Sequence, residues 1–339
     1  MCNADYKYFT NKSGYSNWPT QDSFIPVSVL DISKYAIMNG CYGRKSISYD
    51  AEKFYESSCK MALNLGTEVF TISDDYKEAE TSYKVSISFA MGMLATRIVA
   101  AKVYNVTRLY HFTDHNFSST LNQGKVAPDW FGFNQNGDPF LFESKGTTGK
   151  RISKKAIDHA EEQLNNVKSV KDESTGQIYD KCKIQKHIIG SCFNTHKTHK
   201  THKTQNTYIA NAWQIHDVDP EESGKLELTI NIDKECFWYY RTFIMNIMVL
   251  SDYRNSPRHI TIGNKSYCCW TYESKIYHIP EKIYYMAMSD NYTESNKYQY
   301  FTSRVNEELY SMDYWKKFSQ DEISTYEDGI IVCNSNFQR

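Results

Sequence analysis

The stretch that most limits how this chain can fold is residues 127–146, APDWFGFNQNGDPFLFESKG. Two short β-prone runs, WFGF and PFLFESK, flank the segment NQNGD, in which Asn136 and Gly137 both tolerate a positive φ. This pattern predicts a β-hairpin with a tight turn. Because side chains alternate along a strand, Glu143 and Lys145 share one face of the second strand, and the phenylalanines pack on the other.

The hairpin also predicts a site for chemistry. Its turn folds the first strand antiparallel beside the second, so Asp129 at its start lies level with Glu143. Two converging carboxylates suit Mg²⁺ or Mn²⁺, with water and a substrate phosphate completing the shell. Such an ion polarises a phosphoryl oxygen and lowers the pKa of bound water, and Lys145 could orient that water and offset negative charge. The alternative is an exposed hairpin on which Glu143 and Lys145 form a solvated pair.

The flanking segments predict alternating helices and strands. Apolar side chains recur at helical spacing, and Gly92 among alanines and methionines suggests that its helix packs closely against a neighbour. Residues 1–26 are polar and predict an irregular arm. The expected helices cover residues 50–65, 78–103, 154–170 and 235–250, and the expected strands cover residues 106–112, 182–193, 207–218 and the run KLELTINI.

With this order of elements, Pro128-Asp129 followed by Glu143-Ser144-Lys145 resembles the motif of the PD-(D/E)xK nuclease superfamily. The motif alone arises often by chance, and the surrounding topology strengthens it. The resemblance implies an α/β fold with a restriction-endonuclease-like core, an α-β-β-β-α-β mixed sheet flanked by helices. It covers residues 78–218, between an N-terminal extension (1–77) and a C-terminal α+β region (219–339) that completes the fold or recognises a substrate or partner.

The resemblance also implies roles for individual residues. Asp129, Glu143 and the Ser144 carbonyl would be metal ligands, and Lys145 would be the catalytic lysine. Helical spacing turns Gln163 inward, where some branches of the superfamily use a glutamine; a buried glutamine bonded to backbone is equally compatible. Some members carry an acid on the first helix, and the candidates for that role are Glu78 and Glu80.

Charge is distributed unevenly along the chain. The net charge is −1, yet lysine and arginine outnumber aspartate and glutamate 13 to 6 between Ser144 and Lys203. A basic segment that starts at the candidate site suits a nucleic acid, and Lys150 and Arg151 could contact its phosphates. The alternatives are a solvated helix face and ordinary loop charges. Within this segment, residues 195–204 repeat Thr-His-Lys, which favours a low-complexity hairpin tip over a metal site.

The cysteines and apolar runs bear on the compartment. Nine cysteines occur without a CxxC pair, which favours reduced thiols, and the first ten residues carry no apolar signal core. The apolar runs 85–103 and 237–250 are each broken by an arginine and predict buried helices rather than membrane spans. We therefore expect a cytoplasmic protein without a membrane partner, which could act as a homodimer or with an accessory subunit.

Together these features predict a metal-dependent nuclease that hydrolyses phosphodiester bonds, in DNA rather than RNA, with a role in restriction, repair or phage defence. One alternative is a non-catalytic nucleic-acid-binding or assembly protein on the same fold. Another is an unrelated α/β protein in which the motif arose by chance.

Overall fold

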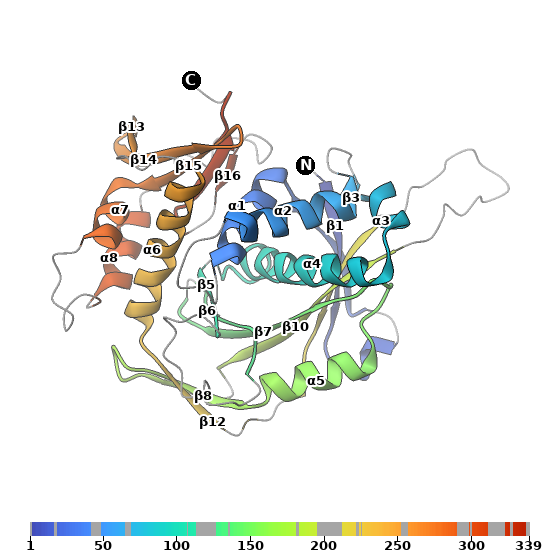
Figure 1. Cartoon of the computed structure of the whole chain (residues 1–339). Coiled ribbons are helices and arrows are strands. Elements are labelled where there is room, and N and C mark those ends of the chain that lie inside the picture. The colour runs from blue at the N-terminus through green and yellow to red at the C-terminus, as the bar shows by residue number, and fades with distance from the viewer. Residues whose placement is uncertain are drawn as a thin grey trace.

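The structure is a computed structural model of the whole chain (Figure 1). It describes most of the sequence with short gaps. The described residues are 2–16, 19–41, 49–64, 69–106, 108–112, 127–134, 136–180, 183–194, 212–221, 224, 226–251, 257–289, 298, 300–310, 323–325 and 328–336. The predicted Thr-His-Lys repeat lies outside these residues.

A mixed seven-stranded sheet forms the centre of the fold, in the order β2-β1-β11-β10-β7-β6-β5. Strands β1 and β11 are parallel, as are β7 and β10, and the other neighbours are antiparallel. The strands are β1 (Cys2–Phe9), β2 (Gln21–Val27), β5 (Arg108–His111), β6 (Trp130–Phe133), β7 (Pro139–Gly146), β10 (Gln185–Phe193) and β11 (Trp213–Val218). The fold is therefore mixed α/β, as the sequence predicts.

Helices cover both faces of this sheet (Figure 1). One face carries α1 (Val29–Cys41), α2 (Tyr49–Ala62) and the long α4 (Thr81–Lys102), and the other carries α5 (Lys154–Leu164). Helix α4 is long and apolar enough to cross a membrane, but 78% of its most apolar window is buried inside the fold. This burial confirms the prediction of a buried core helix. A largely apolar helix is stable in a protein core because the surrounding residues shield it from water.

Helix α4 approaches β7 unusually closely, and two glycines make this possible. A Cβ added to Gly92 would lie 2.9 Å from the carbonyl carbon and oxygen of Lys145. A Cβ added to Gly146 would lie 1.8 Å from the carbonyl oxygen of Ser88. The predicted close packing at Gly92 is confirmed, and it occurs against the strand that carries Glu143 and Lys145.

The N-terminal segment differs from its prediction. The irregular arm expected over residues 1–26 is wrong, because β1 and β2 form there and β1 pairs with β11 in the main sheet. Strand β1 buries Ala4 and Tyr6 on one face, which is the alternation of a half-buried strand. The segment contains many polar residues that mask this alternation, and its pairing partner lies about 200 residues away.

The helix expected over residues 154–170 is also shorter than predicted. Helix α5 ends at Leu164, and residues 167–172 form strand β8 instead. The predicted apolar stripe is buried through Ile157, Ala160 and Leu164, but Val167 belongs to the strand. Asn165 and Asn166 have low helix propensity, so the helix is not strongly favoured beyond Leu164. The parallel pairing of β8 with β12 makes residues 167–172 a strand instead.

The remaining elements complete the fold around the main sheet. Strands β8 (Val167–Asp172), β9 (Ile178–Tyr179) and β12 (Leu226–Ile230) form one small sheet. A second is formed by β13 (Arg258–Ile262), β14 (Lys265–Tyr272), β15 (Lys275–Pro280), β16 (Ile323–Thr325) and β17 (Ile331–Asn334), and a third by β3 (Leu63–Asn64) and β4 (Thr71–Ile72). The other helices are the 3₁₀ turn η1 (Gly14–Ser16), α3 (Asp74–Glu78), α6 (Ile232–Leu250), α7 (Glu281–Met288) and α8 (Phe301–Leu309).

The C-terminal region joins the rest through buried charge. Helix α6, predicted over residues 235–250, packs against α1. The ammonium group of Lys34 on α1 lies 2.8 Å from a carboxylate oxygen of Asp328, and both side chains are fully buried. Tyr239 of α6 donates a hydrogen bond of 2.7 Å to the same carboxylate. The cysteines whose side chains the structure describes are free thiols in buried positions.

Candidate active site

The predicted hairpin is present and determines where the motif residues lie. Strand β6 pairs antiparallel with β7, with Trp130 opposite Phe142. The turn contains Gly137 at a φ of +82°, and the Asn134 side chain accepts hydrogen bonds from the amides of Asn136 and Asp138. Because Trp130 faces Phe142, the preceding residue, Asp129, comes level with Glu143.

Asp129 and Glu143 are held together by reciprocal hydrogen bonds. The Asp129 amide donates to Glu143 Oε2 at 2.9 Å, and the Ser144 amide donates to Asp129 Oδ2 at 2.9 Å. Among the described residues, Asp129 Oδ1 accepts no hydrogen bond, so this oxygen remains for another ligand. Each carboxylate therefore has a fixed direction that the backbone of the hairpin imposes.

Lys145 completes the cluster from the same face of β7. Its Nζ lies 2.5 Å from Glu143 Oε1 and 3.2 Å from Gln163 Oε1 on α5. The Gln163 amide nitrogen donates a hydrogen bond of 3.0 Å to the carbonyl of Ala127, which directly precedes the Pro-Asp pair. Gln163 faces inward, as predicted, and it links the lysine to the start of the hairpin.

Burial and mutual repulsion dominate the electrostatics of the two carboxylates. Glu143 is 1% exposed, and burial followed by the nearby Asp129 charge raises its pKa to about 8, although Lys145 opposes this. Burial likewise raises the pKa of Asp129, against the Ser144 amide and Lys145. A divalent cation between them would offset both effects, because an opposite charge favours the ionised form. The donor set of two carboxylates suits a hard cation.

The side chain of Ser144 points to the opposite face of the sheet. Its Oγ accepts a hydrogen bond of 2.8 Å from Trp130 Nε1 and lies 2.7 Å from Thr96 Oγ1 on α4. The Ser144 side chain therefore cannot contribute on the side of the carboxylates, and the use of its carbonyl as a ligand stays a prediction.

The other predicted residues lie farther from the carboxylates. Lys150 and Arg151 follow β7 in the loop before α5, and Arg151 Nη1 donates 3.3 Å to the Tyr15 carbonyl. Glu78 ends α3, and Glu80 precedes α4 and accepts a hydrogen bond from Ser82. Helix α4 meets Gly146 from Ser88 onward, and the eight residues from Ser88 back to Glu80 span roughly 12 Å. The structure does not bring either glutamate to the site.

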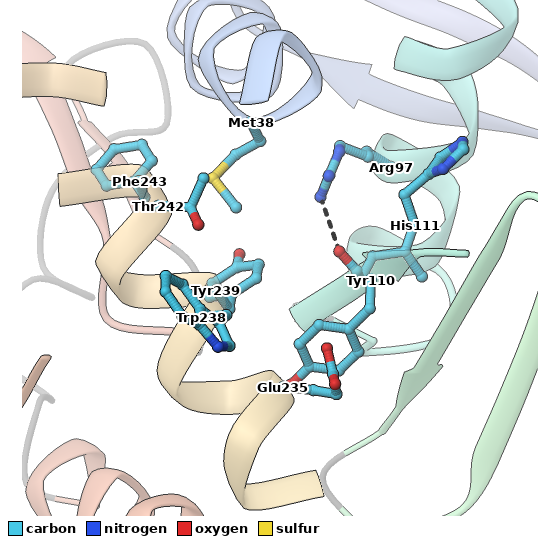
Figure 2. Close-up of a pocket in the computed structure, with 10 residues that line it drawn as sticks. Met38, Arg97, Tyr110, His111, Glu235, Trp238, Tyr239, Thr242 and Phe243 are labelled. Atoms are coloured by element: carbon cyan, nitrogen blue, oxygen red, sulfur yellow. Dashed lines mark hydrogen bonds between the residues drawn. The ribbon is translucent and has the colours of Figure 1, made fainter. Parts of the chain in front are cut away.

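A small cavity lies behind the hairpin, between α1, α4, β5 and α6 (Figure 2). Its polar lining includes Arg97, whose guanidinium stacks 4.5 Å from the Trp130 ring and donates to the Leu109 carbonyl. The volume is about 40 Å³, enough for two or three water molecules and too small for a nucleotide. The cavity is therefore no site for a nucleotide, and Arg97 in its wall packs against Trp130.

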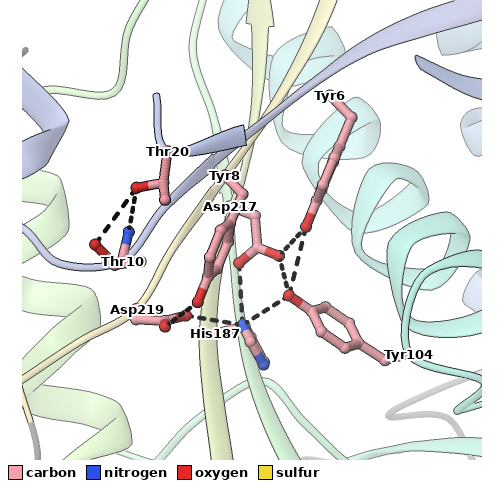
Figure 3. Close-up of polar contacts among 8 residues, drawn as sticks. All are labelled: Tyr6, Tyr8, Thr10, Thr20, Tyr104, His187, Asp217 and Asp219. Carbon is pink, nitrogen blue, oxygen red and sulfur yellow. Dashed lines mark hydrogen bonds and ion pairs between the residues drawn. The ribbon is translucent and has the colours of Figure 1, made fainter. Parts of the chain in front are cut away.

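A second polar cluster was not predicted from the sequence. His187 of β10, Asp217 of β11 and Asp219 bring their side chains together on the α4 face of the sheet (Figure 3). The only local signal is the alternation Asp217-Val218-Asp219 at the end of a strand, because the histidine belongs to another strand.

Comparisons of this chain with protein-family models, with curated proteins and with solved structures each found no match. The resemblance to a nuclease superfamily therefore rests on the residues and topology described above.

Proposed function

We propose that the protein is a metal-dependent nuclease of the PD-(D/E)xK type that hydrolyses phosphodiester bonds in DNA. The observation that carries this proposal is the convergence of Asp129, Glu143 and Lys145 on one hairpin, with Glu143 buried and Asp129 half-buried. The order α4, β5, β6, β7, α5, β10 also supports it, since a restriction-endonuclease-like core has the order α-β-β-β-α-β; here β8 and β9 intervene and belong to another sheet.

In this proposal each residue has a chemical role. Asp129, Glu143 and the Ser144 carbonyl hold Mg²⁺ or Mn²⁺, which supplies Lewis-acid activation of the phosphodiester and of water. Lys145 orients the attacking water and offsets charge that develops in the transition state. Gln163 is a positioning residue, because it holds the Lys145 ammonium group in place. Lys150 and Arg151 contact substrate phosphates.

The test is DNA cleavage by variants of the site. Purified protein is incubated with supercoiled and linear DNA in Mg²⁺, in Mn²⁺ and with chelator, beside Lys145→Ala and Asp129→Ala. Lys282→Ala is the matched control, because its side chain is 79% exposed on α7. We expect metal-dependent cutting that both site variants lower by about 10²–10³-fold and that Lys282→Ala leaves unchanged.

Two results would contradict the proposal. Cutting that persists in folded Lys145→Ala and Asp129→Ala variants would assign the activity to other residues. DNA binding without cutting, together with no binding of Mn²⁺ by calorimetry, would instead favour a non-catalytic nucleic-acid-binding protein on the same fold.

A further inference from the structure

The cluster of His187, Asp217 and Asp219 is separate from the candidate active site. In the parallel pairing of β7 and β10, His187 lies opposite Phe142 and Ile188 lies opposite Glu143. Residues paired in this way point to the same face, so the histidine and Glu143 lie on opposite faces of the sheet. The His187 ring stacks on Tyr104, which follows α4, at 4.2 Å between ring centroids.

The inner atoms of this cluster have the spacing of metal ligands. His187 Nδ1 lies 3.1 Å from Asp217 Oδ1 and 3.2 Å from Asp219 Oδ1, and the three ligand atoms all lie within 4.8 Å of one another. With zinc–ligand bonds of about 2.0–2.2 Å, the ligands of a tetrahedral zinc ion are about 3.3 Å apart.

The outer oxygens of the carboxylates are already satisfied by tyrosines (Figure 3). Tyr6 and Tyr104 donate to Asp217 Oδ2 at 2.7 Å and 2.5 Å, and Tyr8 donates to Asp219 Oδ2. These donors orient the two inner oxygens toward the histidine. Carboxylates that bind a metal usually accept hydrogen bonds from neighbouring residues, and the tyrosines occupy that position here.

One inner oxygen lacks a donor. His187 Nδ1 lies 3.1 Å from Asp217 Oδ1, 3.2 Å from Asp219 Oδ1 and 3.2 Å from the Tyr104 hydroxyl, and it carries at most one hydrogen, so it cannot donate to both carboxylates. Asp219 Oδ1 is buried and accepts no hydrogen bond from any residue that the structure describes. A buried carboxylate oxygen without a partner is costly, and a cation between the three atoms would satisfy all of them at once.

We propose that His187, Asp217 and Asp219 bind a divalent transition-metal ion, with zinc as the best match. An imidazole nitrogen beside two carboxylates favours zinc over Mg²⁺ or Ca²⁺, which prefer oxygen ligands only. The side chain of Asp219 is 29% exposed, so water can supply the fourth ligand from that side. The ligands come from β10, β11 and the residue just after β11, and Tyr6 and Tyr8 on β1 hydrogen-bond to two of them. The ion would therefore connect three strands of the sheet.

The experiment uses the full chain with its other candidate metal sites removed. Asp129→Asn and Glu143→Gln silence the active-site carboxylates, and His196, His199 and His202→Ala silence the Thr-His-Lys repeat. Zn²⁺ alone is titrated into this metal-free background by calorimetry. We expect one ion per chain and a rise in the unfolding temperature with Zn²⁺.

Asp219→Asn in this background tests the ligand set, since its partly exposed position lets the variant fold. Loss of a residue that only hydrogen-bonds to a metal ligand lowers metal affinity by about 10–100-fold. We expect the zinc affinity of Asp219→Asn to fall by more than this, and the zinc affinity of Tyr104→Phe to fall within this range. Asp22→Asn, exposed on β2, is the matched control and keeps full affinity. The proposal is overturned by the absence of a 1:1 ion in the background protein, or by equal affinity in folded Asp219→Asn. Neither outcome affects the DNA-cleavage test, which reads the opposite face of the sheet.

Discussion

Gly146→Ala tests whether the close approach of α4 to β7 maintains the candidate active site. Gly146 directly follows Lys145, and its added Cβ would lie 1.8 Å from the Ser88 carbonyl oxygen and 2.3 Å from its carbon. Real Cβ contacts are essentially never closer than 3.0 Å, so the helix and the strand end must separate by about 1.2 Å. Both clashing atoms belong to a helix backbone, so no side chain can rotate away to relieve the contact.

The magnitude follows from two opposing terms. Overpacking of a well-packed contact costs about 1–3 kcal/mol, and replacing glycine by alanine returns about 0.4–1 kcal/mol through the unfolded chain. Because the clash is with backbone, we expect a net loss of about 2 kcal/mol in the free energy of unfolding. The same shift moves Lys145 relative to Gln163, and a misplacement of about 1 Å can lower a catalysed rate by about 10²-fold.

Urea unfolding measures the stability, and the DNA-cleavage assay measures the rate. Gly149→Ala is the matched control, because its added Cβ would have only one ordinary contact, 3.8 Å from Thr147 Oγ1. It should change the free energy of unfolding by less than about 1 kcal/mol. If Gly146→Ala were as stable as Gly149→Ala, the inferred α4–β7 contact would be wrong. If it were unstable but cleaved DNA at the wild-type rate, the link between this contact and the site would be wrong.

Three further predictions concern other parts of the fold. Lys34→Met should lower the free energy of unfolding by about 3–5 kcal/mol in urea titrations, because it leaves the Asp328 carboxylate buried without its ammonium partner. The control is Lys77→Met on the exposed surface of α3, which should cost less than about 1 kcal/mol. Burial lowers the pKa of His111 from 6.5 to about 3. The folded protein should therefore lose stability as the pH falls from 6.5 toward 3, at up to about 1.4 kcal/mol per pH unit. Denaturant titrations at several pH values measure this slope, and His111→Gln should flatten it. Thr96→Val should cost about 1 kcal/mol by removing a partly buried hydrogen bond to β7; an unchanged urea midpoint would refute this role.

Local sequence alone was enough to predict the hairpin and the residues that meet on it. The Asn-Gly turn sets the register, and strand alternation then places Glu143 and Lys145 on one face with Asp129 level with them. Each of these steps depends on neighbours within about 20 residues. The inward direction of Gln163 follows in the same way, from helical spacing that is intact up to Leu164.

Contacts between distant segments decided the rest. Strand β1 exists because β11, about 200 residues later, offers it a partner, and residues 167–172 form a strand because β12 pairs with them. The meeting of His187 with Asp217 and Asp219 depends on the pairing of β10 with β11 and on tyrosines from β1 and the end of α4. Turn chemistry and side-chain periodicity act over a few residues and are legible in one segment, whereas strand pairing and buried polar clusters combine segments whose proximity only the folded chain creates.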